Sequence, residues 1–200
     1  MSMRKIWLLV AGAVAILAVS AVFAVLLTPP ERLQQSVGVA AIGGPFTLVD
    51  EDGRTVSEED FRGKPTVIYF GFTFCPDVCP TTLYELSGLI QRLGDDAEKL
   101  NFLFVSVDWE RDGPEKMKDY VSAFDPHIRG LSGNEAQIEE IAKAYKIYYK
   151  KVPTDDGDYT IDHTASVYLM DQDGKFVGTL NYGEDSDSMF AKLKRLAGNA

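Results

Sequence analysis

The sequence predicts an α/β fold: a mixed β-sheet with helices on both faces, preceded by one membrane-spanning helix. Two observations carry this prediction. Short apolar runs of strand length alternate with segments whose apolar residues recur every three or four positions, which is the pattern of strands separated by helices. Ahead of them lies an uncharged apolar run of 22 residues, Ile6 to Leu27, which is long enough to cross a bilayer.

The apolar run sets the expected location of the protein. As a helix it rises roughly 33 Å, and a bilayer's hydrocarbon core is about 30 Å thick. Arg4 and Lys5 precede the run, and the positive-inside rule keeps such an N-terminus in the cytoplasm. A cleaved signal peptide is the alternative, but its apolar core usually has about 7–15 residues, so the longer run favours an uncleaved anchor.

We therefore expect a short cytoplasmic N-terminus, one anchor and an exported domain. No Arg- and Ser-rich amphipathic presequence precedes the apolar run, so a bacterial inner membrane fits better than mitochondrial import. Thr28-Pro29-Pro30 ends the helix, because proline cannot continue one. The expected parts are the membrane anchor over residues 1–28, a linker over 29–44 and a periplasmic domain over 45–200.

The exported part is acidic. From Glu31 onward it carries 18 basic and 30 acidic residues, a formal net charge of −12. Such a charge argues against nucleic acid as a partner, because nucleic-acid binding depends on basic surfaces. An acidic surface is compatible with cationic partners, although it more often serves solubility.

Within the exported part the elements follow in a regular order. Asp52-Gly53 and Asp173-Gly174 each separate two short β-rich stretches, which is the signal of a hairpin. Thr66–Phe72 and Asn101–Asp108 are nearly continuous apolar runs, as central strands buried on both faces require. The predicted elements are strands 46–50, 54–56 and 66–72, helix 80–93, strand 101–108, helices 114–124 and 135–146, strands 165–170 and 175–181, and helix 189–196.

The predicted helices have apolar faces that would cover this sheet. Helix 80–93 places Leu83, Leu86, Ile90 and Leu93 on one side. Pro114 stands at a first helical position, where proline is favoured. With a hairpin at each edge the sheet is mixed, and strands separated by helices imply cover on both faces. This is the pattern of the thioredoxin-like sandwich.

The two cysteines of the chain stand close together, at Cys75 and Cys79. They follow directly on the first central strand and lie at the start of the next predicted helix. The carboxyl ends of strands are where α/β sheets place ligands and catalytic groups. A helix N-terminus also stabilises a thiolate and lowers the pKa of a cysteine.

Three interpretations of this pair compete. A structural disulfide would close a very short loop and restrain little chain entropy, so stability is a poor reason for it. Thiol-redox enzymes of the thioredoxin type have two residues between their cysteines, whereas this pair has three. Two thiolates suit a soft metal such as Cu(I) or zinc, with one imidazole completing a three-coordinate site. The spacing favours the metal site and leaves the other two interpretations open.

The chain has two histidines, and one of them is a candidate ligand. His163 lies at the start of the predicted strand 165–170. In a thioredoxin-like sheet this connection faces the loop after the first central strand, so His163 is expected to meet the cysteines. A lone histidine without that topology is more often structural. His127, in an Asp-Pro-His turn, is expected to be exposed and without a role, and Asp77 to be a solvated loop carboxylate.

The string GFTFCPDVCPTTLYEL over residues 71–86, together with FVSVD and GDYTIDHTASVYLMDQDGKFVGTL, resembles the Sco/SenC family. The resemblance covers about residues 42–196. It implies a copper metallochaperone, not a turnover enzyme, that delivers copper to the CuA centre of cytochrome c oxidase during its assembly. Matched position by position, the family's ligands for Cu(I) and Cu(II) fall on Cys75, Cys79 and His163.

The resemblance also implies partners, and at one position the sequence differs from the family's usual pattern. The expected partners are the oxidase subunit that carries the CuA site, the membrane and other periplasmic copper chaperones. Asp162 matches a family residue associated with partner exchange. Trp109 stands where the family often has proline after VSVD, which puts partner contacts in question more than copper binding.

A second function from a different class stays open. The protein would then be a membrane-anchored thiol–disulfide oxidoreductase that keeps the cysteines of the apo-oxidase reduced, with Cys75 and Cys79 as its redox-active disulfide. Both functions are compatible, because copper loading requires reduced thiols on donor and acceptor. A peroxidase is a weaker alternative, since the chain has no resolving cysteine beyond this pair.

Overall fold

The computed structural model describes residue 3, residues 42–155 and residues 157–198. The predicted anchor over Ile6–Leu27 lies outside these residues. In the part of the chain that is described, no helix is both long enough and apolar enough to cross a membrane.

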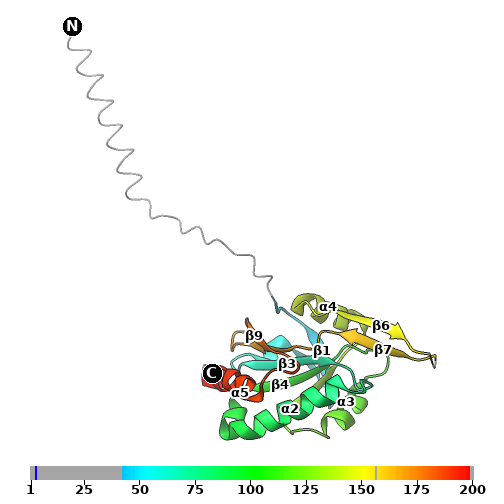
Figure 1. Ribbon diagram of the computed structural model, residues 1–200. Helices are drawn as coiled ribbons and strands as arrows, with labels where there is room; N and C mark the ends of the chain where they lie inside the picture. Colours follow the sequence, from blue (N-terminus) through cyan, green and yellow to red (C-terminus); the bar gives the residue numbers. More distant parts are fainter. Residues whose placement is uncertain (1–2, 4–41, 156, 199–200) are drawn as a thin grey trace. The chain divides into compact units, whose positions relative to one another are not determined.

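A mixed sheet forms the centre of the domain (Figure 1). It has seven strands in the order β2-β1-β5-β4-β3-β8-β9. Its middle strands β5, β4 and β3 run parallel to one another. The antiparallel hairpins β1–β2 and β8–β9 form its two edges, as predicted. The strands are β1 (Thr47–Asp50), β2 (Thr55–Ser57), β3 (Thr66–Gly71), β4 (Asn101–Ser106), β5 (Ile128–Ser132), β8 (Val167–Met170) and β9 (Phe176–Leu180).

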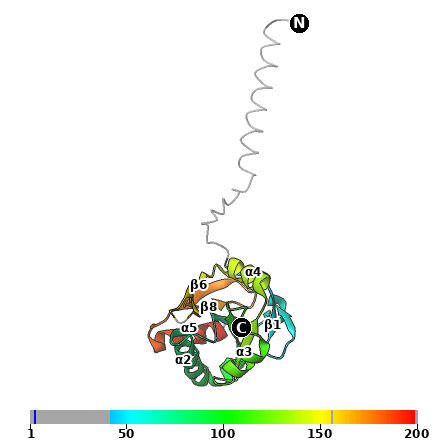
Figure 2. The same ribbon diagram turned by 90° about the vertical axis from the view of Figure 1, so that its right-hand side faces the viewer.

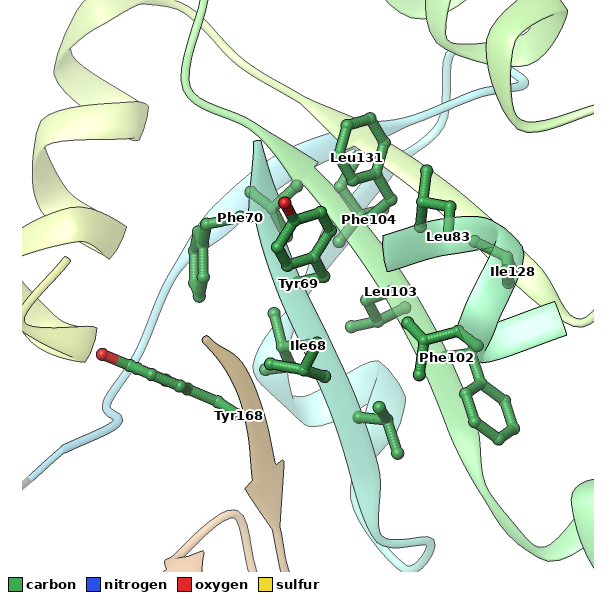
Figure 3. Packing of buried hydrophobic residues seen from close by; sticks show 14 of the residues in the cluster. Ile68, Tyr69, Phe70, Leu83, Phe102, Leu103, Phe104, Ile128, Leu131 and Tyr168 are labelled. Atoms are coloured by element: carbon green, nitrogen blue, oxygen red, sulfur yellow. The ribbon is translucent and has the colours of Figure 1, made fainter. Parts of the chain in front are cut away.

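Helices cover both faces of this sheet (Figures 1 and 2). Every residue of β3 is buried, and neighbouring side chains point to opposite faces (Figure 3). On one face the ring of Phe70 lies 5.7 Å from that of Tyr145 in α4. On the other face the ring of Phe104 lies 5.4 Å from that of Tyr120 in α3. The α-helices are α2 (Val78–Leu93), α3 (Pro114–Val121), α4 (Glu135–Tyr145) and α5 (Ser186–Gly198), and η1 (Glu58–Phe61) and η2 (Gly94–Lys99) are 3-10 helices.

The structure confirms the predicted thioredoxin-like arrangement and corrects its details. Helix α2 begins two residues earlier than predicted, at Val78, so that Cys79 lies in its first turn. The prediction missed β5, a central strand, because its sequence IRGLS has no long apolar run. It also missed a second, two-stranded sheet made of β6 (Tyr149–Pro153) and β7 (Tyr159–His163). Both of these strands are mostly half-buried or exposed and therefore lack the apolar signal of a core strand.

Candidate metal centre

The two cysteines lie where β3 passes into α2. Cys75 is half-buried in the connecting loop, and Cys79 is fully buried. The backbone N–H of Cys79 donates to the sulfur of Cys75 across 3.4 Å. This places the Cys75 sulfur at the N-terminal end of a helix, which stabilises a thiolate. Both thiols are free.

The sulfur of Cys79 packs directly on the backbone of β3. A Cβ atom built on Gly71 would lie 2.7 Å from this sulfur and 2.8 Å from the Phe104 ring. Only glycine leaves room for both groups at that position. The hydroxyl of Tyr69 lies 3.6 Å from the same sulfur. The buried thiol is thus fixed by a strand backbone and one hydroxyl.

His163 reaches the cysteines from a different element than predicted. It is the last residue of β7, in the separate hairpin, and it does not begin the central strand β8. Its Nδ1 lies 2.9 Å from the backbone carbonyl oxygen of Thr164, and its Nε2 lies 3.4 Å from the sulfur of Cys79. Because a carbonyl oxygen only accepts, Nδ1 carries the proton. In the neutral ring, Nε2 therefore presents its lone pair to the sulfurs, as a metal ligand must.

Aromatic rings hold the imidazole in this orientation. Phe72 contacts it edge-on at 5.8 Å between ring centroids, and Tyr69 does so at 6.3 Å. The Cys75 and Cys79 sulfurs and one His163 nitrogen all lie within 4.8 Å of one another. Among the described residues, this is the one such group of three potential metal ligands. Two sulfurs and one imidazole nitrogen form a donor set that suits a soft ion, above all Cu(I).

The two thiols differ in acidity. The pKa of Cys75 lies well below its ordinary value, because the Cys79 thiol and the backbone N–H groups at the start of α2 donate to its sulfur and outweigh its burial. The pKa of Cys79 is raised, because it donates to the Cys75 thiolate and is itself buried. Burial and the nearby sulfurs raise the pKa of Tyr69, so its hydroxyl stays protonated and able to donate. A metal ion would therefore find one thiolate ready and displace a proton from the second thiol.

Comparison with known proteins places this geometry in a family. A model of the SCO1/SenC family matches residues 34–198. The chain belongs to the SCO1/SenC family.

Its relatives include proteins of mitochondria and bacteria. Over 155 residues, 77% of this chain, it is 41% identical to "Protein SCO1 homolog 1, mitochondrial" of Arabidopsis thaliana, of which the match covers 46%. The chain thus spans about half the length of such mitochondrial relatives. The structure of Bradyrhizobium japonicum ScoI with copper bound is similar with a TM-score of 0.73 and 54% identity, covering 78% of this chain and 99% of that one.

A third relative has a reported disulfide switch. BsSco, reported to have a disulfide switch and to be a member of the Sco family of cytochrome c oxidase assembly proteins, is 27% identical. Its TM-score is 0.63, and the match covers 79% of this chain and 95% of that one. The resemblance to Sco/SenC proteins that the sequence motifs indicated is therefore confirmed.

A buried carboxylate in this SCO1/SenC chain orders residues 72–79, the connection between β3 and α2 together with the start of α2, which we call the cysteine loop. Asp112 accepts hydrogen bonds from the backbone N–H and the hydroxyl of Thr73, at 2.8 and 2.6 Å, and from the hydroxyl of Ser106 at 2.6 Å. Thr73 lies two residues before Cys75, so this carboxylate fixes the start of the loop. Sequence reasoning did not single out Asp112, and its position shortly after a predicted central strand was the one available signal.

The other residues that the sequence analysis considered are not part of the group of three ligands. His127 is bonded through Nδ1 to Asp125 at 2.7 Å and through Nε2 to Glu98 at 3.1 Å, and both bonds contribute to raising its pKa. It is thus tied to two carboxylates and is less exposed than predicted. Asp77 is exposed at the start of α2, and Asp162 is exposed on β7 beside His163.

Proposed function

We propose that this protein is a copper metallochaperone that holds one copper ion between Cys75, Cys79 and His163. It delivers this ion to the subunit of cytochrome c oxidase that carries the CuA site. The convergence of two sulfurs and one imidazole nitrogen within 4.8 Å carries the proposal. The copper-bound Bradyrhizobium relative supports the identity of the metal, and the oxidase-assembly role reported for the family of BsSco supports the destination.

The proposed ligands differ in burial, which would let the site both hold a copper ion and pass it on. Cys79 is fully buried and His163 is wedged between aromatic rings, whereas Cys75 is half-exposed on the loop. An incoming thiolate of the recipient can therefore approach the ion on the Cys75 side and displace the ligands one after another. Thiolates favour Cu(I), while the imidazole nitrogen lets the same site accept Cu(II).

The location forms part of the same proposal. Residues 1–28 would anchor the protein in a bacterial inner membrane, and residues 29–44 would link the anchor to the copper-binding domain over 45–200. The apolar run Ile6–Leu27 and the two basic residues ahead of it support this arrangement. The domain would then face the periplasm, on the side where a CuA site is assembled.

Copper transfer tests this function. The reduced, Cu(I)-loaded protein is mixed with a reduced apo-CuA domain, and the copper on each partner is measured after separation. Transfer is expected with the wild type, and none with Cys75→Ser or Cys79→Ser, because each variant loses one of two thiolate ligands. A wild-type protein that keeps its copper in the presence of excess acceptor would contradict the proposal.

The thiol–disulfide oxidoreductase stays as a second candidate because of one observation. The half-buried Cys75 has the lowered pKa and the fully buried Cys79 the raised pKa, which is the arrangement of an attacking and a resolving thiol. The disulfide switch reported for BsSco supports it. Insulin reduction separates the two functions: we expect the reduced protein to be much slower than thioredoxin, and a comparable rate without copper transfer would favour the oxidoreductase.

A further inference from the structure

The loop after β4 lies between the two parts of the candidate metal centre, which are the cysteine loop and the β6–β7 hairpin. Its residues 108–112, which we call the bridge segment, contact the cysteine loop on one side and the β6–β7 hairpin on the other. Asp108 and Asp112 at its ends are both fully buried. The cysteine loop supplies two of the three proposed ligands, and the hairpin supplies the third.

Arg111 makes several contacts between the bridge segment and the hairpin. Its Nε donates to Asp108 at 2.6 Å, and its Nη1 donates to the carbonyl oxygen of Tyr159 at 3.0 Å and to Asp158 at 3.1 Å. Its guanidinium also lies 3.7 Å from the centre of the Tyr159 ring. The Tyr159 hydroxyl in turn donates to Asp108 at 2.7 Å. Tyr159 is the first residue of β7, the strand that ends at His163.

The same guanidinium also contacts the cysteine loop. It lies 4.6 Å from the centre of the Phe74 ring, and Phe74 directly precedes Cys75. Asp112, which directly follows Arg111, accepts the two hydrogen bonds from Thr73. The guanidinium of Arg111 therefore contacts one aromatic ring of the cysteine loop, Phe74, and one of the hairpin, Tyr159. Only 15% of the Arg111 side chain is exposed. A planar guanidinium with several donors suits this position, and a lysine could not reproduce it.

The hairpin buries few of its own side chains. It forms a sheet of its own, separate from the seven-stranded one, and Ile161 is its one fully buried residue. Two further contacts come from the bridge segment itself. Trp109 packs edge-on against Tyr149, the residue paired with His163, and Glu110 forms an ion pair with Lys151 at 2.7 Å.

We propose that Arg111 is a positioning residue for the metal centre: it joins the cysteine loop to the β6–β7 hairpin and so keeps His163 within reach of the two sulfurs. This inference rests on the proposed function, because it takes His163 to be the third copper ligand. Without Arg111 the hairpin loses a side chain that contacts both Tyr159 and Phe74, and we expect the imidazole to be held less firmly at the 3.4 Å that now separates it from Cys79.

The substitution Arg111→Met tests the proposal, since methionine keeps much of the apolar stem and removes the donors. Arg129→Met is the matched control. Arg129 likewise pairs with a buried carboxylate, Asp50 at 2.8 Å, and lies over an aromatic ring, Phe61, but it does not contact the hairpin. Hydrogen exchange of the metal-free protein is the first measurement. Amides of β6 and β7 should exchange at least tenfold faster in Arg111→Met than in the wild type, and at an unchanged rate in Arg129→Met.

The Cu(II) complex provides the second measurement. Arg111→Met should lose nitrogen hyperfine structure and bind Cu(II) about tenfold more weakly, in the direction expected for His163→Ala, while keeping Cu(I) binding by both sulfurs. Because both substitutions remove the same ligand, the double variant should bind no more weakly than His163→Ala alone. If Arg111→Met does not fold, Tyr159→Phe removes the hydroxyl bond to Asp108 and should show the same changes to a smaller degree.

The outcomes separate this inference from the proposed function. A wild-type protein that binds no copper would overturn the function and leave the hydrogen-exchange result to decide whether Arg111 holds the hairpin. A wild type that binds copper, with Arg111→Met indistinguishable from it in hairpin exchange and in the Cu(II) spectrum, would overturn the positioning role. Losses of Cu(II) affinity that add up in the double variant would also overturn it, because they would show that Arg111 acts independently of His163.

Discussion

At the scale of single residues, each proposed ligand is prepared by a neighbour. The Thr164 carbonyl fixes the tautomer of His163, the backbone of Gly71 leaves space for the Cys79 sulfur, and the start of α2 stabilises the Cys75 thiolate. None of these groups would touch the ion. They define where the donor atoms lie and in which protonation state they meet copper, so their removal has predictable effects.

Removing the imidazole should separate the two oxidation states of copper. His163→Ala leaves both sulfurs, so we expect Cu(I) binding to persist and Cu(II) binding to weaken at least tenfold, with altered thiolate-to-Cu(II) absorbance. His127→Ala is the control, since His127 bonds to Asp125 and Glu98 and not to the sulfurs. Identical copper titrations of the wild type and His163→Ala would place the third ligand elsewhere.

Adding one methyl group at Gly71 should disturb the buried cysteine. Gly71→Ala forces a Cβ against the Cys79 sulfur and the Phe104 ring, both closer than 3 Å. Such overpacking typically costs about 1–3 kcal/mol, measured as the free energy of unfolding. Gly88→Ala is the matched control: its Cβ meets nothing within 4 Å, and on a helix it should stabilise by about 0.5–1 kcal/mol. Equal stability of the two variants would refute the close packing.

The lowered pKa of Cys75 should appear in its reactivity with iodoacetamide. Only the thiolate reacts, so an ordinary cysteine with a pKa of about 8.5 slows roughly tenfold per pH unit below that value. Because the pKa of Cys75 is depressed, its alkylation rate should stay nearly constant between pH 8 and pH 6. The protein unfolded in denaturant provides the ordinary cysteine for comparison. A folded protein that slows as steeply as the unfolded one would contradict the thiolate assignment.

At the scale of elements, the metal centre depends on how three connections meet: the loop from β3 to α2, the loop after β4 and the β6–β7 hairpin. The buried Asp112 joins the first two, because it accepts three hydrogen bonds from Thr73 and Ser106. It lies just before α3 and thereby ties the cysteine loop to the start of that helix.

Asp112→Asn should loosen this junction. The amide replaces one acceptor oxygen by a donor, which faces either the Thr73 hydroxyl bonded to Oδ1 or the Thr73 N–H and Ser106 hydroxyl bonded to Oδ2. An unsatisfied buried polar group costs about 1–3 kcal/mol. Urea unfolding of the metal-free protein measures this loss. Asp119→Asn, an exposed substitution on α3, should change the stability by less than about 0.5 kcal/mol. A loss no larger than that of the control would show that Asp112 does not support the loop.

The elements also show what could be predicted from the sequence. Apolar runs and turn signals located β3, β4, the two edge hairpins and the helices, because these features depend on local pattern and burial. The strand β7 was missed, since a half-exposed hairpin held by polar side chains has no such pattern. His163 was nevertheless expected near the cysteines from topology. Arg111 and Asp112 act through contacts between distant segments, and no local signal reveals those.

At the scale of the whole molecule, the thioredoxin-like sandwich places the ligands at one edge of the described domain. The cysteines follow the carboxyl end of a parallel central strand, which is where α/β sheets gather functional groups. A formal charge of −12 from residue 31 onward favours solubility and disfavours contact with nucleic acid.

The central claim is that the two thiolates bind copper together, and a Cu(I) titration in competition with a chelator tests it most directly. The purified protein is titrated once with Cys75 and Cys79 reduced and once with the two sulfurs joined as a disulfide. Oxidation removes both soft ligands at once. The reduced protein should take up one Cu(I) per chain and the oxidised protein almost none. Equal uptake by both forms would contradict the claim.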